Sequence, residues 1–163
     1  MMYRKTLLFL AMIFTSLSLF AQTAKNNGSI APFDITLADG SSFKASQLKK
    51  GPVMLVYFSP ECDHCRHFTK EMLEKHKSFA GEQIVMVTFL PADEVKHFSE
   101  EFKLPSYHNI IAGTEGKTFV VRNYYNVTQF PFVVLYNREG KQVKIFSSRP
   151  DVDDIIKAIK KKG

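Results

Sequence analysis

Two continuous apolar segments constrain the fold of this chain more than any other feature. They read VMLVYF at residues 53–58 and IVMVTFL at residues 84–90. Neither segment alternates between polar and apolar positions, so each is expected to form a strand covered on both faces of a sheet. A sheet covered in this way needs helices on both sides, which predicts an α/β fold.

Helical patterns follow both predicted strands. Apolar residues recur at intervals of three and four from residue 62 to about residue 80, where Gly81 ends the pattern, and a second helix is expected within residues 91–104. A third helix is predicted at the C-terminus, because acids at 151–154 and lysines at 157–162 complement the two ends of a helix dipole.

Two hairpins complete the expected sheet. Residues 33–37 and 42–46 flank an Asp-Gly turn, and residues 132–146 hold two apolar runs around the turn sequence NREG. Between the second helix and this later hairpin, a short strand near Ile110 and a helix around residues 119–125 are expected. The prediction is a mixed central sheet flanked by helices, with an N-terminal β-hairpin extension.

Residues 1–21 have the pattern of a secretory signal peptide. Arg4 and Lys5 precede a charge-free run that ends at Phe20, and the small residue Ala21 follows. A retained membrane anchor is the alternative, but a span needs about 20 apolar residues and this run is interrupted by threonine and serine. We expect cleavage after Ala21, export to the periplasm and no stable membrane insertion afterwards.

One domain is expected after the signal peptide. Residues 22–31 are polar and read as a flexible leader, and residues 32–163 are long enough to bury about two thirds of their unfolded surface. The formal net charge of the chain is +6, but its lysines are dispersed except at residues 160–162. We therefore expect a solvated basic surface and no nucleic-acid partner. The protein is also expected to be a monomer.

The only two cysteines, Cys62 and Cys65, directly follow the first buried strand in the sequence SPECDHCRHF. A disulfide this short would stabilise the fold little, because the entropic effect grows with the size of the enclosed loop. If a helix begins at Cys62, its sulfur lies among unpaired N–H groups that favour a thiolate, whereas Cys65 lies on the apolar face one turn later. Thiol–disulfide exchange needs this asymmetry between an exposed nucleophile and a protected resolving thiol.

His64, between the two cysteines, is a candidate for tuning their chemistry. A protonated His64 would favour the Cys62 thiolate and make the pair more oxidising, whereas Glu61 and Asp63 would act in the opposite direction. The alternative is an exposed histidine without effect. Redox chemistry of this kind uses the disulfide itself and needs no bound cofactor.

The chain resembles the thioredoxin superfamily, and most of all its exported TlpA/ResA branch of thiol-disulfide oxidoreductases. The resemblance rests on PFDITLADGSSFKASQLKKGPVMLVYF, on CDHC at the start of a helix, and on YYNVTQFPFVVLYNREGKQV. It implies a thioredoxin-like fold in which Pro131 is a cis-proline that faces the cysteines. Phe130 and Pro131 would bind the backbone of the substrate. It also implies protein thiols and disulfides as substrates, and a further redox partner that recharges the cysteine pair.

The chain departs from the family pattern in three places. Glu61 stands where many members have tryptophan, and Val56 stands where thioredoxin has a buried acid, so Cys65 would need another base such as Glu61, or water. His64 resembles the dipeptides of disulfide isomerases and strong oxidants more than that of thioredoxin. The direction of electron transfer therefore stays open at this point.

Metal binding is an alternative of another class. Cys62, Cys65 and His67, with His64 or His76, could supply ligands for copper or zinc in a metal-binding or chaperone protein. A structural zinc site usually takes a second pair of ligands at a distance, and the sequence offers no such pair.

A thiol peroxidase is a third option within the same superfamily. The proline and threonine that such enzymes carry ahead of their cysteine are matched only by Ser59, with Leu55 where the proline belongs. This option therefore ranks below the other two.

Overall fold

A computed structural model describes residues 28–161, which form a seven-stranded mixed sheet in the order β2-β1-β5-β4-β3-β6-β7. The expected signal peptide and residues 22–27 of the expected leader lie outside the described residues. The strands are β1 Asp34–Leu37, β2 Ser42–Lys44, β3 Val53–Tyr57, β4 Gln83–Thr88, β5 Ile110–Thr114, β6 Phe132–Tyr136 and β7 Gln142–Phe146. The mixed sheet with an N-terminal hairpin confirms the predicted fold class.

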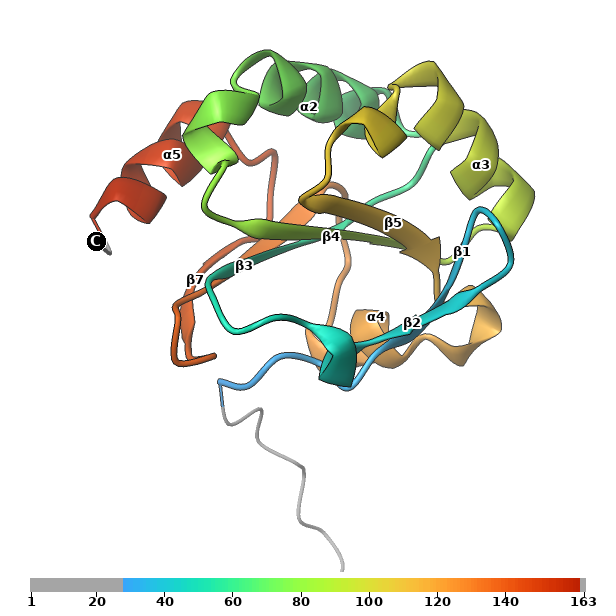
Figure 1. Cartoon of the computed structure of the whole chain (residues 1–163), viewed down its shortest axis with the longest axis horizontal. Helices are drawn as coiled ribbons and strands as arrows, with labels where there is room; N and C mark the ends of the chain where they lie inside the picture. Colours follow the sequence, from blue (N-terminus) through green and yellow to red (C-terminus); the bar gives the residue numbers. More distant parts are fainter. Residues whose placement is uncertain (1–27, 162–163) are drawn as a thin grey trace, which may run out of the picture.

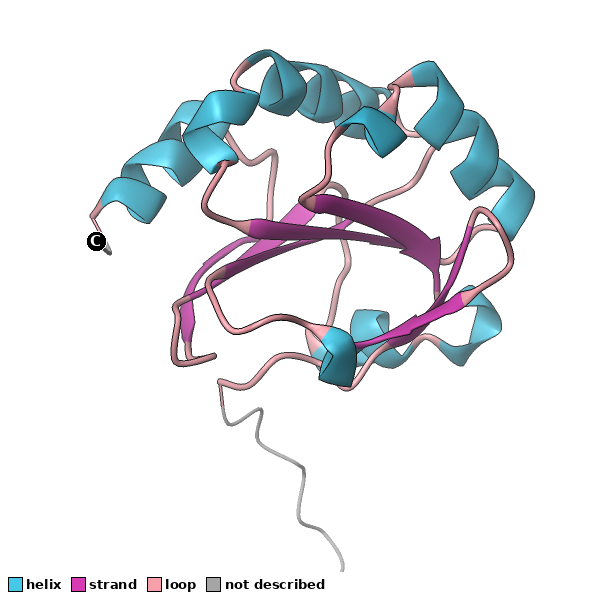
Figure 2. Cartoon of the chain, in the orientation of Figure 1, coloured by secondary structure: helices cyan, strands magenta, loops and turns pink. Residues whose placement is uncertain are grey.

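Helices cover both faces of this sheet. Three helices lie on one face and the short fourth helix lies on the other, as Figures 1 and 2 show. They are α2 Asp63–Glu74, α3 Ala92–Glu101 and α5 Val152–Lys160 on the first face, and α4 Val120–Tyr124 on the second. The two layers explain why the central strands carry no polar alternation.

Side chains of β3 alternate between two hydrophobic cores. Met54 and Val56 point toward α2, α3 and α5, whereas Leu55 and Tyr57 point toward α4 and the N-terminal segment. All four side chains are fully buried. The core on the α2 side also contains Cys65, so the strand before the cysteines and the helix after them pack on the same residues.

Strand pairing sets which loops meet at the carboxyl end of β3. β3 is parallel to β4 and antiparallel to β6, and Tyr57 at the end of β3 pairs with Phe132 at the start of β6. The segment that leaves β3 toward the cysteines therefore lies beside the segment that enters β6. That entering segment contains Pro131.

The helix predicted from residue 62 to about residue 80 is interrupted, which corrects the sequence prediction. α2 ends at Glu74, and a separate 3-10 helix covers His76–Phe79. The break turns the His76 ring toward the segment before β5, where it hydrogen-bonds Asn109 Oδ1 at 2.7 Å and packs against Tyr107. The break coincides with this contact to a distant segment, which periodicity alone does not show.

Residues 28–31, placed by the sequence in the leader, are attached to the fold. The Ala31 N–H donates to the Tyr125 hydroxyl at 2.9 Å, and the Tyr136 hydroxyl donates to the Ser29 carbonyl at 3.1 Å. The two tyrosine hydroxyls lie 2.5 Å apart, and burial raises the pKa of Tyr125 to about 12. The hydrogen-bonded fold thus begins before the expected boundary at residue 32.

Gly113 allows the N-terminal hairpin to pack closely on the rest of the sheet. It lies in β5, and a Cβ at this position would be 2.9 Å from the Thr36 carbonyl oxygen and 2.9 Å from Ile35 Cδ1. Both contacts belong to β1, and backbone atoms cannot move aside cheaply.

We predict that Gly113→Ala lowers the free energy of unfolding by about 1–3 kcal/mol, because the new methyl group overpacks the β1–β5 contact. Urea denaturation of the two proteins would measure the difference. The matched control is Gly81→Ala, where a Cβ meets nothing within 4 Å, and there the change should stay within about 1 kcal/mol. Equal midpoints for both variants would contradict the predicted overpacking.

Candidate functional site

Cys62 is the N-cap residue of α2. Its Sγ accepts a hydrogen bond from the backbone N–H of Cys65, with 3.4 Å between nitrogen and sulfur. This N–H belongs to the first turn of the helix, where backbone donors lack an intrahelical partner and the dipole favours negative charge. Cys62 is half-buried, and both cysteines are free thiols in this structure. The backbone therefore holds the Cys62 sulfur at the N-terminal end of the helix, against a first-turn N–H donor.

Cys65 lies one turn further along α2 and is fully buried. Its neighbours in the core include Val56, Phe68 and Met72. Burial raises the pKa of the Cys65 thiol well above its usual range, because the charged form loses its hydration. The two cysteines thus differ as the sequence predicted, with one reachable sulfur and one shielded sulfur.

Among the described residues, no buried carboxylate stands in for the buried acid of thioredoxin, whose place in the sequence is taken here by Val56. The described part of the chain has two buried acids, Glu82 and Glu115. Glu82 precedes β4, at the opposite end of the parallel strands, and Glu115 binds Tyr57, whose side chain lies on the other face of the sheet. Glu61 is exposed beside Cys62. Glu61 and water therefore remain the candidates for taking the proton of Cys65.

The peptide bond between Phe130 and Pro131 is cis, at the position where the resemblance placed a cis-proline. Pro131 is buried, and it lines a cavity of about 230 Å³ together with His64 from the first turn of α2. The start of the cysteine helix and the cis-proline, which are far apart in the sequence, therefore meet at one place. The structure brings together all five site residues that the sequence singled out: Cys62, His64, Cys65, Phe130 and Pro131.

Phe130 belongs to an aromatic group that the sequence did not predict. Its ring lies 5.8 Å from the ring of Tyr57 and 5.9 Å from that of Phe89. The Arg122 guanidinium stands over three rings, 5.6 Å from Phe89, 5.7 Å from Phe119 and 6.0 Å from Phe130. These residues come from separate segments, so only the strand order of the sheet could have revealed the group. Phe89, Phe119 and Phe130 are half-buried, so their rings form a partly exposed apolar surface that includes the residue before the cis-proline.

The buried Glu115 binds residues next to this aromatic group. The sequence analysis did not predict its role. Its carboxylate accepts hydrogen bonds from the Tyr57 hydroxyl at 2.6 Å and from the backbone N–H of Val121 at 2.6 Å. Burial raises the pKa of Tyr57, which keeps the hydroxyl protonated as a donor. The carboxylate thereby joins the start of α4 to the end of β3. The signal available in the sequence was the position of Glu115, an acidic residue directly after the predicted strand near Ile110.

The ligands proposed for a metal site do not come together. Within residues 28–161, no three His, Cys, Asp or Glu side chains have an arrangement that could hold a metal ion. His76 is engaged by Asn109 and Tyr107, and His67 is exposed on α2. The arrangement of donors thus gives the metal-binding alternative no support.

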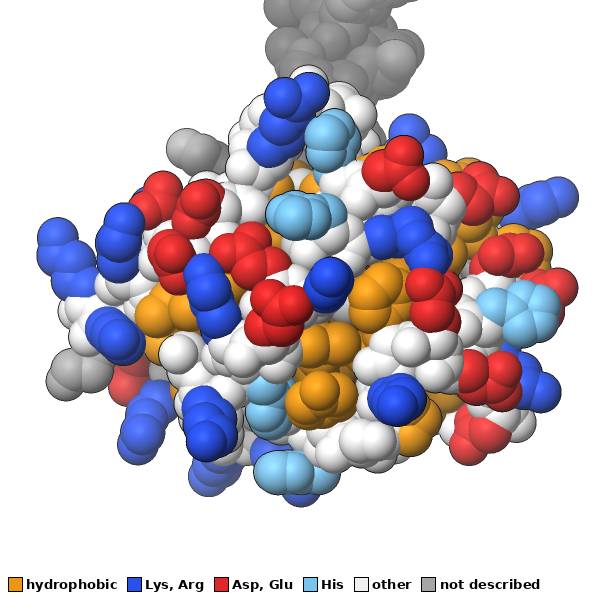
Figure 3. Space-filling model, turned by 90° about the horizontal axis from the view of Figure 1, so that it is seen from above, with side chains coloured by type: hydrophobic (Ala, Val, Ile, Leu, Met, Phe, Trp, Pro, Cys, Tyr) orange, Lys and Arg blue, Asp and Glu red, His pale blue; other side chains and the backbone are white. Residues whose placement is uncertain are grey.

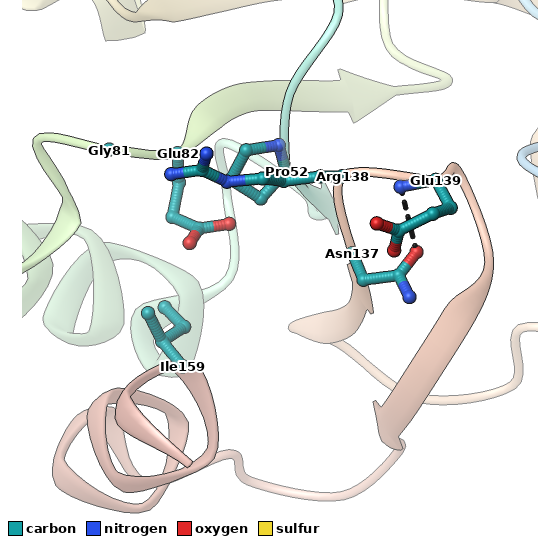
Figure 4. A pocket seen from close by; sticks show the side chains of 7 residues that line it. All are labelled: Pro52, Gly81, Glu82, Asn137, Arg138, Glu139 and Ile159. Atoms are coloured by element: carbon teal, nitrogen blue, oxygen red, sulfur yellow. Dashed lines mark hydrogen bonds between the residues drawn. The ribbon is translucent and has the colours of Figure 1, made fainter. Parts of the chain in front are cut away.

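A second cavity lies at the opposite end of the parallel strands. It has a volume of about 240 Å³ and is lined by residues that include Pro52 and Glu82, directly before β3 and β4, as well as Arg138 (Figure 4). The cysteines follow β3, so this cavity is not part of their site.

The surface on the side of α2, α3 and α5 carries both signs of charge. Figure 3 shows acidic and basic side chains interspersed over this face, with apolar side chains between them. A surface with mixed signs gives no continuous basic stripe of the kind that binds nucleic acid. None of the helices in the described part of the chain is long and apolar enough to cross a membrane.

Solved structures share this fold. The thioredoxin domain of a thiol-disulfide oxidoreductase from Bacteroides vulgatus is 26% identical, with a TM-score of 0.67 and coverage of 83% of this chain and 96% of that chain. A secreted Mycobacterium tuberculosis disulfide oxidoreductase homologous to E. coli DsbE is 17% identical, with a TM-score of 0.67 and coverage of 80% and 96%. Peroxidoxin BcpB from M. tuberculosis is 15% identical, with a TM-score of 0.69 and coverage of 82% and 94%. At 17% and 15% identity, the two M. tuberculosis structures show only that the fold is shared.

Sequence comparison places the chain in a family. No curated protein gives a significant match to it. A family model for the thioredoxin-like domain matches residues 40–162, which contain both cysteines, the cis-proline and all four α-helices of the described part. By this match, which covers most of the chain, the protein belongs to the thioredoxin-like domain family.

Proposed function

We propose that this protein is an exported thiol-disulfide oxidoreductase that exchanges a Cys62–Cys65 disulfide with thiols and disulfides of other proteins. The observation that carries the proposal is that Cys62 Sγ accepts the N–H of Cys65 in the first turn of α2, while His64 of the same turn lines one cavity with the cis-proline Pro131. The family match and the oxidoreductase from B. vulgatus support the same chemistry. The reaction needs only the two thiols and the polypeptide substrate.

The reaction has two exchange steps. In the reducing direction, the Cys62 thiolate attacks one sulfur of a substrate disulfide, forms a mixed disulfide with it and releases the other substrate sulfur as a thiolate. Cys65 then loses its proton and attacks Cys62 Sγ, which closes the Cys62–Cys65 disulfide and releases the second substrate sulfur. Two electrons pass from the protein to the substrate, and both released thiolates take up protons. In the oxidising direction the same steps run in reverse.

The burial of Cys65 explains why the second step follows the first. A shielded thiol with a raised pKa does not react with substrates that diffuse freely, but it lies one helical turn from the mixed disulfide on Cys62. A base such as Glu61, or water, accepts its proton in this step. Phe130 and Pro131 bind the main chain of the substrate beside the sulfurs, as the resemblance implies.

Export and the redox partner are part of the same proposal. Residues 1–21 have the pattern of a signal peptide, and the structurally similar M. tuberculosis oxidoreductase is described as secreted. After each turnover the cysteine pair must be recharged by a further thiol or disulfide, so the proposal includes a redox partner that supplies it. No observation in the structure favours the thiol peroxidase option, because the likeness to peroxidoxin BcpB shows the fold alone.

Replacing the resolving thiol should trap substrates. In Cys65→Ser the first step proceeds and the second cannot, so covalent complexes through Cys62 accumulate and turnover is lost. Non-reducing electrophoresis and mass spectrometry of the captured proteins would detect these complexes. Cys62→Ser is the matched control and should capture nothing. An absence of mixed disulfides in the Cys65→Ser protein would count against the mechanism.

His64→Ala tests the role of the residue between the cysteines. A protonated His64 would stabilise the reduced form beside the Cys62 thiolate, so the reduction potential of the variant should fall, by about 20–40 mV. A titration against glutathione redox buffers would measure it. His97→Ala removes an exposed histidine from α3 and serves as the control. If both variants keep the potential of the unmodified protein, His64 has no tuning role.

A further inference from the structure

The turn between β3 and α2 contributes to the surroundings of both cysteines. The backbone N–H of Cys62 donates to the Ser59 carbonyl at 3.1 Å, which closes a tight turn around Pro60. Cys62 ends this turn and is the N-cap of α2. Burial raises the pKa of Cys65, and a hydrogen bond from the Ser59 backbone, at the other end of the turn, lowers it in part. The conformation of the turn therefore sets the position of one sulfur and a hydrogen bond to the other.

The side chain of Arg66, directly after Cys65 in the first turn of α2, makes three contacts. Its Nη1 donates to the Pro60 carbonyl at 3.3 Å, in the middle of the turn before Cys62. Its Nη2 pairs with the carboxylate of Glu101, the last residue of α3, and its guanidinium lies over the ring of Phe102 at 5.5 Å. In Figure 1 the start of α2 lies beside the end of α3. Arg66 thus joins the turn to a second helix.

These contacts together order the Arg66 guanidinium more than the ion pair with Glu101 would alone. A partly exposed ion pair contributes little by itself, because water screens it and two long side chains lose entropy. The last turn of α3, residues 98–101, carries no basic residue, so Arg66 supplies the positive charge that the C-terminal end of a helix favours. A guanidinium presents its donors in a fixed fork, so it binds the Pro60 carbonyl and the Glu101 carboxylate at the same time.

We propose that Arg66 is a positioning residue for the second exchange step, in which Cys65 attacks the mixed disulfide on Cys62. By fixing the Pro60 carbonyl, Arg66 keeps the turn in the conformation that places Cys62 at the helix N-terminus, one helical turn from Cys65. The rate of an intramolecular attack depends strongly on such alignment, whereas the first step needs only a reachable Cys62. This inference rests on the proposed function and adds a residue that acts on one of its two steps.

The experiment follows the two steps separately with dithiodipyridine, an uncharged aromatic disulfide. The reduced protein without residues 1–21 is mixed with an equal amount of this reagent at several concentrations. Cys62 attacks one sulfur of the reagent and releases the first pyridine thiolate, and Cys65 then attacks Cys62 Sγ, closes the disulfide and releases the second. Each thiolate takes up a proton, and its absorbance reports its release. Only the rate of the first step depends on concentration, so stopped-flow records resolve both steps.

Variants then assign the effect to the guanidinium. In Arg66→Ala the second step should slow about fivefold, and the first step should change by less than about twofold. Arg66→Lys keeps the charge but replaces the fork by a single ammonium group, so its second step should stay slow. Glu101→Gln removes the anion that fixes the guanidinium and should slow the second step by a smaller factor.

Lys75→Ala is the matched control. It removes another cation of α2, which pairs with Asp153 of the loop-to-helix segment at α5 at 2.7 Å, but at the far end of the helix from the cysteines. Both steps should keep their rates in this variant. Arg66, Glu101 and Lys75 are all partly exposed, so these changes leave the core intact.

The outcomes separate this inference from the proposed function. An unchanged second step in Arg66→Ala, or a slowing of both steps by the same factor, would overturn the inference and leave the oxidoreductase proposal standing. A full rate in Arg66→Lys would also overturn it, since the effect would then come from charge alone. Equal slowing in Lys75→Ala would do the same, because loss of any ion pair of α2 would then suffice. If the unmodified protein releases no second thiolate, the proposed function itself fails.

Discussion

The antiparallel pairing of β3 with β6 is the constraint on which the candidate site depends. It places Tyr57 opposite Phe132, so the segment that leaves β3 and the segment that enters β6 lie side by side at the carboxyl end of β3. The first segment carries Cys62 and the second carries Pro131. A shift of one residue in this register would turn the side chains of β6 to the opposite face and separate the two segments. The hydrophobic alternation of both strands therefore also fixes the geometry of the site.

The two hydrophobic cores, one on each face of the sheet, surround different groups near the cysteines. On the α2 face, Val56 and Cys65 belong to the same hydrophobic core, and burial there raises the pKa of the resolving thiol. On the α4 face, Tyr57 and Glu115 form a buried polar contact that ties α4 to β3. The acid that this chain keeps in its interior near the site is thus separated from Cys65 by the sheet. Its contacts give it a structural role at α4 and no path to the thiol.

Much of this arrangement could be predicted from local sequence signals. The buried strands, the helix that starts at Cys62 and the two hairpins follow from periodicity and turn residues, and the cis bond before Pro131 follows from the family resemblance. The early end of α2 coincides with the His76–Asn109 hydrogen bond between distant segments, which local signals do not show. The stacking of Arg122 on three phenylalanines depends on strand order, and a single sequence does not show strand order.

The lack of tryptophan in this chain changes how the surface beside the cysteines is built. In many relatives by resemblance, a tryptophan before the first cysteine supplies apolar surface from the active-site loop itself, whereas Glu61 occupies that place here and is exposed. The apolar surface comes instead from Phe89, Phe119 and Phe130, which three other segments hold in place. Glu61 thereby leaves an exposed carboxylate in the position directly before Cys62. On the proposed function, substrate contact and proton transfer would thus fall to different parts of the fold.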